Sequence, residues 1–124
     1  MHIIISNKSD KPIYAQIVEQ LKEQIISGKI LQGKPLPSIR ALASELSISV
    51  ITTKRAYEEL EREGYIETVP GKGSFVAEQN REMVKEAYLK TIEDNLAEAI
   101  RASRVIKLSL HELKEILEYI YDEE

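Results

Sequence analysis

The sequence predicts a mainly α-helical chain with a small β-hairpin, in which a winged helix-turn-helix domain is followed by a two-helix tail. Three observations predict this fold. Two amphipathic helices meet across a tight turn at residues 47–49. Two short strand-like runs then flank a proline- and glycine-rich turn at residues 70–73. The last part of the chain returns to a helical period, so we expect one domain over residues 1–77 and a helical tail over residues 78–124.

The first helix is predicted from apolar residues that recur every four positions. These are Ile13, Ile17, Leu21 and Ile25. They follow a polar, turn-rich lead-in that ends at Pro12, and proline fits the first turn of a helix because its missing N–H costs nothing there. The helix should end at Ser27-Gly28, since glycine readily adopts the left-handed cap. Two prolines within residues 35–37 exclude a helix from the following loop.

The helix-turn-helix is expected between residues 38 and 64. Ser38 and Ser49 each precede a helical pattern, and a serine hydroxyl can accept a backbone N–H, so both are predicted helix caps. Ile48, in the turn, should fill the angle between the two helices. The second helix should end at Gly64. Its inward residues, at helical spacing, are Thr53, Ala56, Tyr57 and Leu60.

The hydrophobic period changes after this helix. Residues 65–69 and 74–77 are short β-type runs, and Pro70-Gly71-Lys72-Gly73 between them is a turn signal. A hairpin directly after a helix-turn-helix is typical of a wing. Its glycines let the backbone approach a narrow groove, and its lysine can meet phosphate. An ordinary surface hairpin is the alternative interpretation.

The tail is predicted to form two amphipathic helices. The stripe of the first consists of Val84, Tyr88, Ile92, Leu96 and Ile100. The second begins at Ser109 with a complete capping box to Glu112, and its apolar face includes Leu113, Ile116, Leu117 and Ile120. Two such helices cannot enclose a metabolite pocket of ordinary size, but they can bury their stripes against a second copy. Folding of the stripes back onto the first domain is the alternative.

Charge is divided unevenly along the chain. The net charge is −4, yet residues 1–77 hold 10 Lys and Arg against 9 Asp and Glu, whereas residues 78–124 hold 7 against 12. Five cations belong to the segment that would face DNA: Lys34, Arg40, Lys54, Arg55 and Lys72. Exposed charges are screened over about 8 Å at physiological salt, so this local excess matters more than the total. A solvated mixed-charge surface would also account for these cations.

Several classes of protein are disfavoured by the same sequence. The absence of cysteine excludes disulfides and thiolate zinc sites, and His2 and His111 lack ligand-spaced partners, so we expect no metal. No run approaches the roughly 20 apolar residues of a membrane span, and the N-terminus lacks the features of a signal peptide. No glycine-rich phosphate loop, nucleophile–histidine–acid set or lysine cofactor motif is present. We therefore expect a cytoplasmic protein that is not an enzyme and needs no cofactor.

Taken as a set, the motifs resemble the DNA-binding half of the GntR superfamily of bacterial transcription regulators. They are Leu36-Pro37-Ser38-x-Arg40, Leu42-Ala43, Leu46-x-Ile48-Ser49, Arg55-Ala56-Tyr57-x-x-Leu60-x-x-Glu63-Gly64-Tyr65-Ile66 and Gly71-Lys72-Gly73-Ser74-Phe75-Val76. The resemblance is close over residues 10–77. The short helical tail is similar to that of the YtrA-type branch, which lacks the large effector or aminotransferase-like domain of other members.

The resemblance implies which residues contact DNA. Ser38 matches a phosphate contact at a helix N-terminus, and Arg40 matches a contact to phosphate or guanine. The start of the recognition helix is matched by Ser49, Thr52 and Lys54, and the wing tip by Gly71, Lys72 and Gly73. The chain departs from many relatives at two places: it has Val50-Ile51 just after the turn, where they have a polar or basic residue, and Ala41 where they have an acid.

The first departure suggests a particular way of reading bases. Val50 and Ile51 lie outside the inward stripe, so at least one should be exposed. In the major groove their methyl groups have one good partner, the C5-methyl of thymine. We therefore expect part of the half-site to be read as thymine, with Lys54 meeting a neighbouring guanine or a phosphate. An exposed β-branched residue with no such role is the alternative.

The sequence as a whole predicts a homodimeric transcription regulator, more specifically a repressor, that binds a palindromic operator in double-stranded DNA. Dimerisation is expected through the tail helices, since two-fold symmetry supplies a pair of half-sites. A winged-helix module that binds protein instead of DNA is the alternative, and it would lack the steep salt dependence of phosphate contacts. No motif identifies a small-molecule effector.

Overall fold

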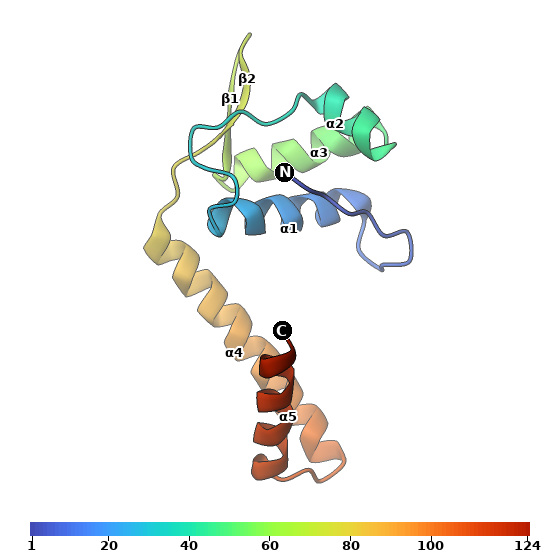
Figure 1. Ribbon diagram of the computed structural model, residues 1–124, viewed down its shortest axis with the longest axis vertical. Helices are drawn as coiled ribbons and strands as arrows, with labels where there is room; N and C mark the ends of the chain where they lie inside the picture. Colours follow the sequence, from blue (N-terminus) through green and yellow to red (C-terminus); the bar gives the residue numbers. More distant parts are fainter. The chain divides into compact units, whose positions relative to one another are not determined.

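The computed structural model describes residues 1–124 and has five helices and one antiparallel hairpin (Figure 1). In chain order the elements are α1 (Ile13–Ile26), α2 (Ile39–Leu46), α3 (Val50–Arg62), β1 (Ile66–Val69), β2 (Gly73–Val76), α4 (Arg81–Val105) and α5 (Leu110–Glu123). The predicted fold class is confirmed. The chain forms two compact units, residues 1–80 and residues 81–124.

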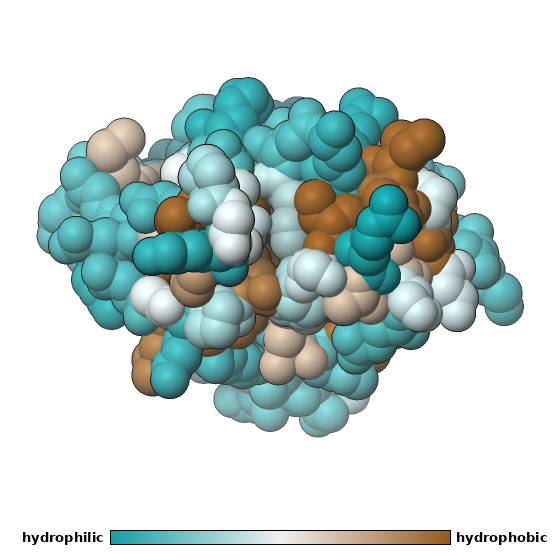
Figure 2. Space-filling view, turned by 90° about the horizontal axis from the view of Figure 1, so that it is seen from above, coloured by the Kyte–Doolittle hydropathy of each residue, from teal (hydrophilic) through white to brown (hydrophobic).

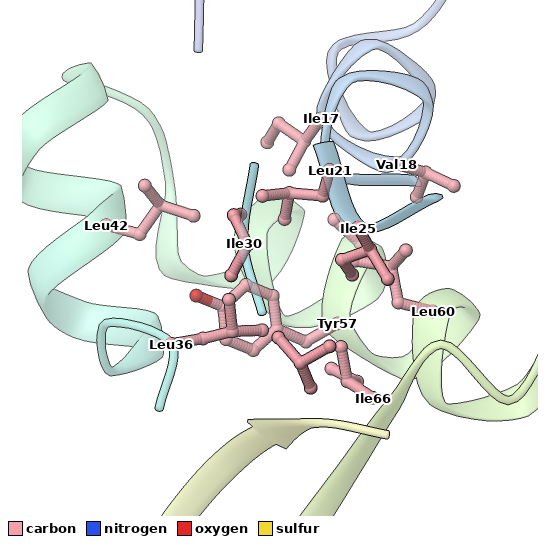
Figure 3. Packing of buried hydrophobic residues seen from close by; sticks show 12 residues of the cluster. Ile17, Val18, Leu21, Ile25, Ile30, Leu36, Leu42, Tyr57, Leu60 and Ile66 are labelled. Atoms are coloured by element: carbon pink, nitrogen blue, oxygen red, sulfur yellow. The ribbon is translucent and has the colours of Figure 1, made fainter. Parts of the chain in front are cut away.

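The core of the first unit lies where α1, α2 and α3 meet the base of the hairpin (Figure 3). Its largest fully buried side chains are Ile17, Leu21, Leu42, Leu60, Ile66 and Thr53. The apolar positions that predicted α1 and α3 are thus the ones that enter the core. The predicted ends are also confirmed: α1 ends before Gly28, whose φ is +82°, and α3 ends before Gly64, whose φ is +83°. Pro12 is the N-cap of α1 rather than its first residue.

The N-terminal segment is held against α1 by three glutamine side chains. The glutamines recur every four residues, so their amides line one face of the helix. Each amide both accepts an N–H from one residue of the segment and donates to the same residue's carbonyl. The pairs are Gln24 with His2, Gln20 with Ile4 and Gln16 with Ser6, with N···Oε1 distances of 3.3, 2.8 and 2.8 Å and Nε2···O distances of 2.7, 2.7 and 3.0 Å. Ile3 and Ile5, between the paired residues, pack against the core.

The hairpin forms the expected antiparallel pair, with Ile66 opposite Val76 and Val69 opposite Gly73. The turn is closed by the Lys72 N–H, which donates to the Val69 carbonyl at 2.9 Å. Gly71 has a φ of +76°, which is the geometry that the third residue of a type II turn requires. Strand β2 begins at Gly73, one residue earlier than predicted, because Gly73 pairs with Val69.

The loop before α2 adds a third extended segment beside β2, which sequence patterns did not predict. The Gly33 N–H donates to the Val76 carbonyl at 2.8 Å, and the Val76 N–H donates to the Lys34 carbonyl at 2.9 Å. Pro35 lies opposite Phe75 as an isolated bridge. A proline cannot donate an N–H to a ladder, so the prolines of this loop indicate only that it is not helical.

The second unit consists of α4, α5 and the turn between them. The turn is closed by the Leu108 N–H, which donates to the Ser103 carbonyl at 2.9 Å. The predicted capping box is confirmed, since Ser109 and Glu112 exchange side-chain to backbone hydrogen bonds, each of 3.1 Å. Ser103 is the one buried residue of either helix. No helix of the chain combines the length and the apolar character needed to cross a membrane.

Candidate nucleic-acid interface

The two predicted serine caps are both formed. The Ser38 Oγ accepts the Ala41 N–H at 3.0 Å, and the Ser49 Oγ accepts the Thr52 N–H at 3.0 Å. Their hydroxyl hydrogens differ. The Ser49 hydroxyl donates to the Thr52 Oγ1 at 2.8 Å, whereas the structure shows no acceptor for the Ser38 hydroxyl. The Ser38 hydroxyl can therefore still donate to a group outside the chain. At the start of α3, the hydroxyl that can still donate is that of Thr52 and not that of Ser49.

The turn between α2 and α3 sets the angle of the helix-turn-helix. Ser47 has a φ of 56°, a left-handed conformation that glycine adopts more easily than serine. The Ile48 N–H donates to the Ala43 carbonyl at 3.0 Å, which completes the helix end. Ile48 itself is half-buried and packs against the core, as predicted. The left-handed residue reverses the chain direction and places the capped start of α3 beside α2.

The inner face of α3 is fixed by both apolar and polar contacts. Ala56 and Leu60 are fully buried, and Thr53 donates its hydroxyl to the Ser49 carbonyl at 3.1 Å. The Tyr57 hydroxyl donates to the Pro37 carbonyl at 2.7 Å, just before the cap of α2. Burial raises the pKa of Tyr57 to about 12, so the hydroxyl stays protonated and able to donate even at alkaline pH. Tyr57 thus ties α3 to the start of α2.

The outer face at the start of α3 is open to solvent. Ile51 is 81% exposed and Val50 40%, which confirms the prediction that at least one of them would be exposed. Lys54 follows on the same side and is also exposed. Figure 2 looks from above, the side toward which the hairpin tip points in Figure 1, and shows a mainly hydrophilic face with separate apolar patches. An exposed apolar group beside cations can contact both base methyls and phosphates.

The remaining sequence-predicted residues lie at the start of α2 and at the hairpin tip. Arg40 is exposed in the first turn of α2, and Lys72 is exposed in the turn between two glycines of positive φ. The hairpin contacts the C-terminal half of α3, where Thr68 donates its hydroxyl to Glu61 at 2.6 Å. The candidate residues therefore form two groups: one where α2 and α3 begin, and one at the tip of the hairpin.

The cations of this surface are free of acidic partners. Arg40, Lys54 and Lys72 form no ion pair within the chain. Arg62, near the end of α3, differs because it binds Glu59 through two hydrogen bonds, and the hydrogen bond from Arg62 lowers the pKa of Glu59. A cation without an acidic partner can bind a phosphate without first breaking an ion pair.

Arg55 belongs to the segment expected to face DNA, but sequence patterns predict no individual contact for it. Its guanidinium carbon lies 3.8 Å from the ring centroid of Tyr14, a half-buried residue in the first turn of α1. The two residues are far apart in sequence, and no motif joins them. Only the packing of α1 against α3 brings them together.

The candidate dimerisation residues are mostly exposed. The exposed fractions on α4 are 40% for Tyr88, 51% for Ile92, 45% for Leu96 and 38% for Ile100, and those on α5 are 44% for Ile116, 50% for Leu117 and 50% for Ile120. Val84 and Leu113 are half-buried. No cluster of histidine and acidic side chains could hold a metal ion, and exposed His111 pairs with Glu115 at 2.7 Å.

Residues 13–76 match the family described as bacterial regulatory proteins, gntR family. The chain is 36% identical over 118 residues to the HTH-type transcriptional repressor YtrA of Bacillus subtilis (strain 168), covering 95% of this chain and 91% of that protein. Its fold is similar to that of a transcriptional antiterminator from Listeria monocytogenes EGD-e, with a TM-score of 0.74, 33% identity and coverage of 98% and 90% of the two chains. The DNA-binding domain of AraR, solved in complex with operator ORX1, matches with a TM-score of 0.55 and 29% identity over 62% of this chain and 96% of that domain.

Proposed function

The chain belongs to the gntR family of bacterial regulatory proteins and is a DNA-binding transcription regulator, not an enzyme, and we propose that it acts as a homodimeric repressor on a palindromic operator. The observation that carries the proposal is the open outer face of α3. This face lies at a capped helix start with exposed Ile51 and Lys54, on a helix whose other face is locked into the core. The relatives above are transcription regulators, which leaves a protein-binding module without support.

In the proposed complex, α3 occupies the major groove and residues 1–77 act as the DNA-binding domain. Val50 and Ile51 meet thymine methyl groups, while Thr52 and Lys54 offer a hydroxyl and an ammonium to neighbouring bases or phosphates. Ser38 and Arg40 contact the backbone from the start of α2, where the free Ser38 hydroxyl and the helix N-terminus both favour an anion. Ser49 acts mainly through its cap, because its hydroxyl hydrogen is used by Thr52.

The hairpin acts as the wing in this proposal. Gly71 and Gly73 have positive φ and carry no side chain, so the backbone at the tip can come close to DNA. Lys72 then meets phosphate. Lys72→Ala should weaken binding to operator and to random DNA similarly, and should lower the slope of log affinity against log salt by about one unit for each wing that contacts DNA. Unchanged affinity and slope would exclude a DNA-contacting wing.

Dimerisation is proposed to occur through residues 78–124. The apolar stripes of α4 and α5 are 38–51% exposed at the seven positions from Tyr88 to Ile120, and neither helix buries an apolar residue. An exposed stripe this long marks an interaction surface. A second copy offers the same stripe, and a two-fold dimer presents two recognition helices to two half-sites. Because a transcription regulator acts where its operator DNA is, we place the protein in the cytoplasm.

One experiment tests the DNA-binding function itself. The intact protein is titrated with DNA from its own promoter region and with a shuffled duplex, at several salt concentrations. A regulator of the proposed kind prefers the promoter DNA, and its affinity falls steeply with salt because phosphate contacts release counterions. Binding that neither distinguishes the two duplexes nor depends on salt would contradict the proposal.

A further inference from the structure

We infer that Arg55, held on the ring of Tyr14, contacts a backbone phosphate at the edge of the groove that α3 enters. The inference rests on the proposed function, since it takes α3 as the helix in the major groove. It adds one contact that neither the motif nor the resemblance assigned. It also gives Tyr14 the role of a positioning residue, which acts on DNA through Arg55 and not by direct contact.

The position of Arg55 on α3 places it at the rim of the outer face. Residues 51 and 55 are one helical turn apart, so Arg55 follows the exposed Ile51 on the face opposite the buried Thr53, Ala56 and Leu60. The stacking on Tyr14 shows that its side chain leans toward α1. The major groove is about 12 Å wide and a helix with its side chains spans about 10–12 Å, so the helix fills the groove. A cationic side chain that extends to one side of the helix therefore reaches the backbone phosphates at the edge of the groove and not a base.

The stacked geometry leaves the guanidinium ready to bind an anion. Arg55 is exposed and forms no ion pair, and the nearby Glu59 carboxylate is already bound by Arg62, whose Nε lies 3.1 Å from Glu59 Oε2. The N–H groups of a guanidinium lie in its own plane, so a ring against one face leaves them available. The ring also restricts the long side chain before DNA arrives, which reduces the entropy lost on binding.

Two arginines on the same helix supply a matched pair of variants. Arg55→Gln removes a free, stacked cation, whereas Arg62→Gln removes one that is already neutralised by Glu59. We expect Arg55→Gln to weaken binding by roughly tenfold, the factor of one charge-assisted hydrogen bond, and to lower the salt slope by about 0.9 per bound protomer. Because Glu59 also interacts electrostatically with Arg55, Arg62→Gln is combined with Glu59→Gln, so that no released carboxylate can pair with Arg55. This double variant should change neither quantity. The intact protein and a duplex it selects from random-sequence DNA are the probes.

The phosphate itself is located by replacing one phosphate at a time with a neutral methylphosphonate along that duplex. The affinity of the wild-type protein should fall roughly tenfold when the methylphosphonate is at one position beside the half-site. The affinity of Arg55→Gln should not change with the methylphosphonate at that position, and at the other positions it should respond as the wild type does. Tyr14→Phe keeps the ring and should bind as wild type. Tyr14→Leu should bind more weakly while remaining sensitive to the same phosphate, since the cation is still present but less well placed.

A purely structural role for the stacked pair makes different predictions. Circular dichroism and thermal unfolding show whether each variant is folded, and Arg55→Lys keeps the charge if Arg55→Gln does not fold. Arg55→Lys should keep the wild-type salt slope with reduced affinity. The inference is overturned if Arg55→Gln keeps wild-type affinity and slope, if it stays sensitive to every methylphosphonate, or if Arg55→Lys loses the slope. Failure of wild-type protein to select any duplex would overturn the proposed function and this inference together.

Discussion

The two units of the chain use similar helical patterns and reach opposite results. Residues 1–80 contain all 14 of the buried apolar side chains, whereas α4 and α5 contain none. Both regions have apolar residues at helical spacing, such as Ile17 and Leu21 in α1 and Ile92 and Leu96 in α4. In the first unit, three helices and a hairpin supply partners for one another. In the second, the stripes of both helices are only partly covered, and none of their apolar residues is fully buried.

This difference shows that an amphipathic pattern indicates which face of a helix can be buried, but not which surface will cover that face. Burial stabilises by about 25 cal/mol for each Å² of apolar surface removed from water, whichever chain supplies the partner. The first unit obtains this free energy within itself. The second unit covers its stripes only in part, so a further surface can add to this free energy, and a second copy is the partner proposed above.

The largest expected effect comes from breaking the tail. Leu96→Asp or Ile116→Asp places a carboxylate in the stripe, where burial of an unpaired charge is costly, so the dimer should dissociate. Operator affinity should then fall by roughly two orders of magnitude or more, because the second half-site no longer acts at high effective concentration. Removing residues 79–124 should have the same effect and leave a folded monomer. Sedimentation and operator titration measure both quantities.

A control for this prediction lies on the polar side of the same helix. Lys90→Asp introduces the same side chain at an exposed position, where an ion pair with Asp94 is replaced by two like charges one turn apart, and both changes have small effects on an exposed helix surface. It should leave the dimer and the operator affinity nearly unchanged. If the intact protein sediments as a monomer at micromolar concentration, the apolar stripes of the second unit are not covered by a second copy, and the proposed dimer is wrong.

The self-sufficiency of the first unit can be tested at the glutamines that hold the N-terminal segment. Gln16 is 7% exposed and binds the Ser6 backbone and the Lys11 carbonyl, so Gln16→Leu leaves those groups without partners. We expect a loss of about 2 kcal/mol in the free energy of unfolding. Gln24→Leu, where water can replace the exposed amide, should cost less. Chemical denaturation of both variants measures the difference, and equal losses would contradict this role of the buried amide.

A smaller effect is expected at Tyr57, and it depends on pH. Tyr57→Phe removes the hydrogen bond to Pro37 and should cost about 1 kcal/mol at neutral pH. The pKa of Tyr57 is raised from 10.0 to about 12 in the folded state, so above pH 10 the unfolded chain loses this proton first. Wild-type stability should therefore fall between pH 10 and 12 through this group, and Tyr57→Phe should lack that part of the fall. Thermal unfolding across this pH range checks it.

The smallest expected effect concerns Val50 and Ile51, whose proposed role differs from that of the exposed apolar residues in the second unit. The proposed partner of Ile51 and Val50 is a thymine methyl, and not another protein surface. Replacing thymine by uracil in the half-site should weaken binding by about 0.5–1 kcal/mol, the transfer free energy of one methyl group. The double variant Val50→Ala with Ile51→Ala should bind both duplexes equally. An absence of any uracil effect on wild-type affinity would exclude this readout.

Much of the first unit could be predicted because its signals are local. A serine before a helical pattern accepts a backbone N–H within its own turn, so Ser38, Ser49 and Ser109 were identifiable as caps from sequence alone. Gly28 and Gly64 ended their helices as expected. Ser47 shows the limit of such signals, because it takes a left-handed conformation without being glycine, at a helix end closed by the Ile48 N–H on the Ala43 carbonyl.

The contacts that the sequence did not reveal join residues far apart in the chain. The glutamine amides of α1 bind the backbone of the N-terminal segment, as a neighbouring strand would do in a sheet. The apolar pattern of an extended segment does not show whether its backbone is bound by another strand or by side chains. Arg55 stacks on Tyr14 because two helices meet at that angle.

The order of elements, the three serine caps, the apolar face of each helix and the family follow from the sequence alone, since these depend on local motifs, short-range periodicity and turn chemistry. Tertiary packing decides what lies beside Arg55, because the ring of Tyr14 reaches it only where α1 meets α3. Arg62 is paired within its own helix, whereas Arg55 is held by a ring from α1 and keeps its N–H groups for an outside anion.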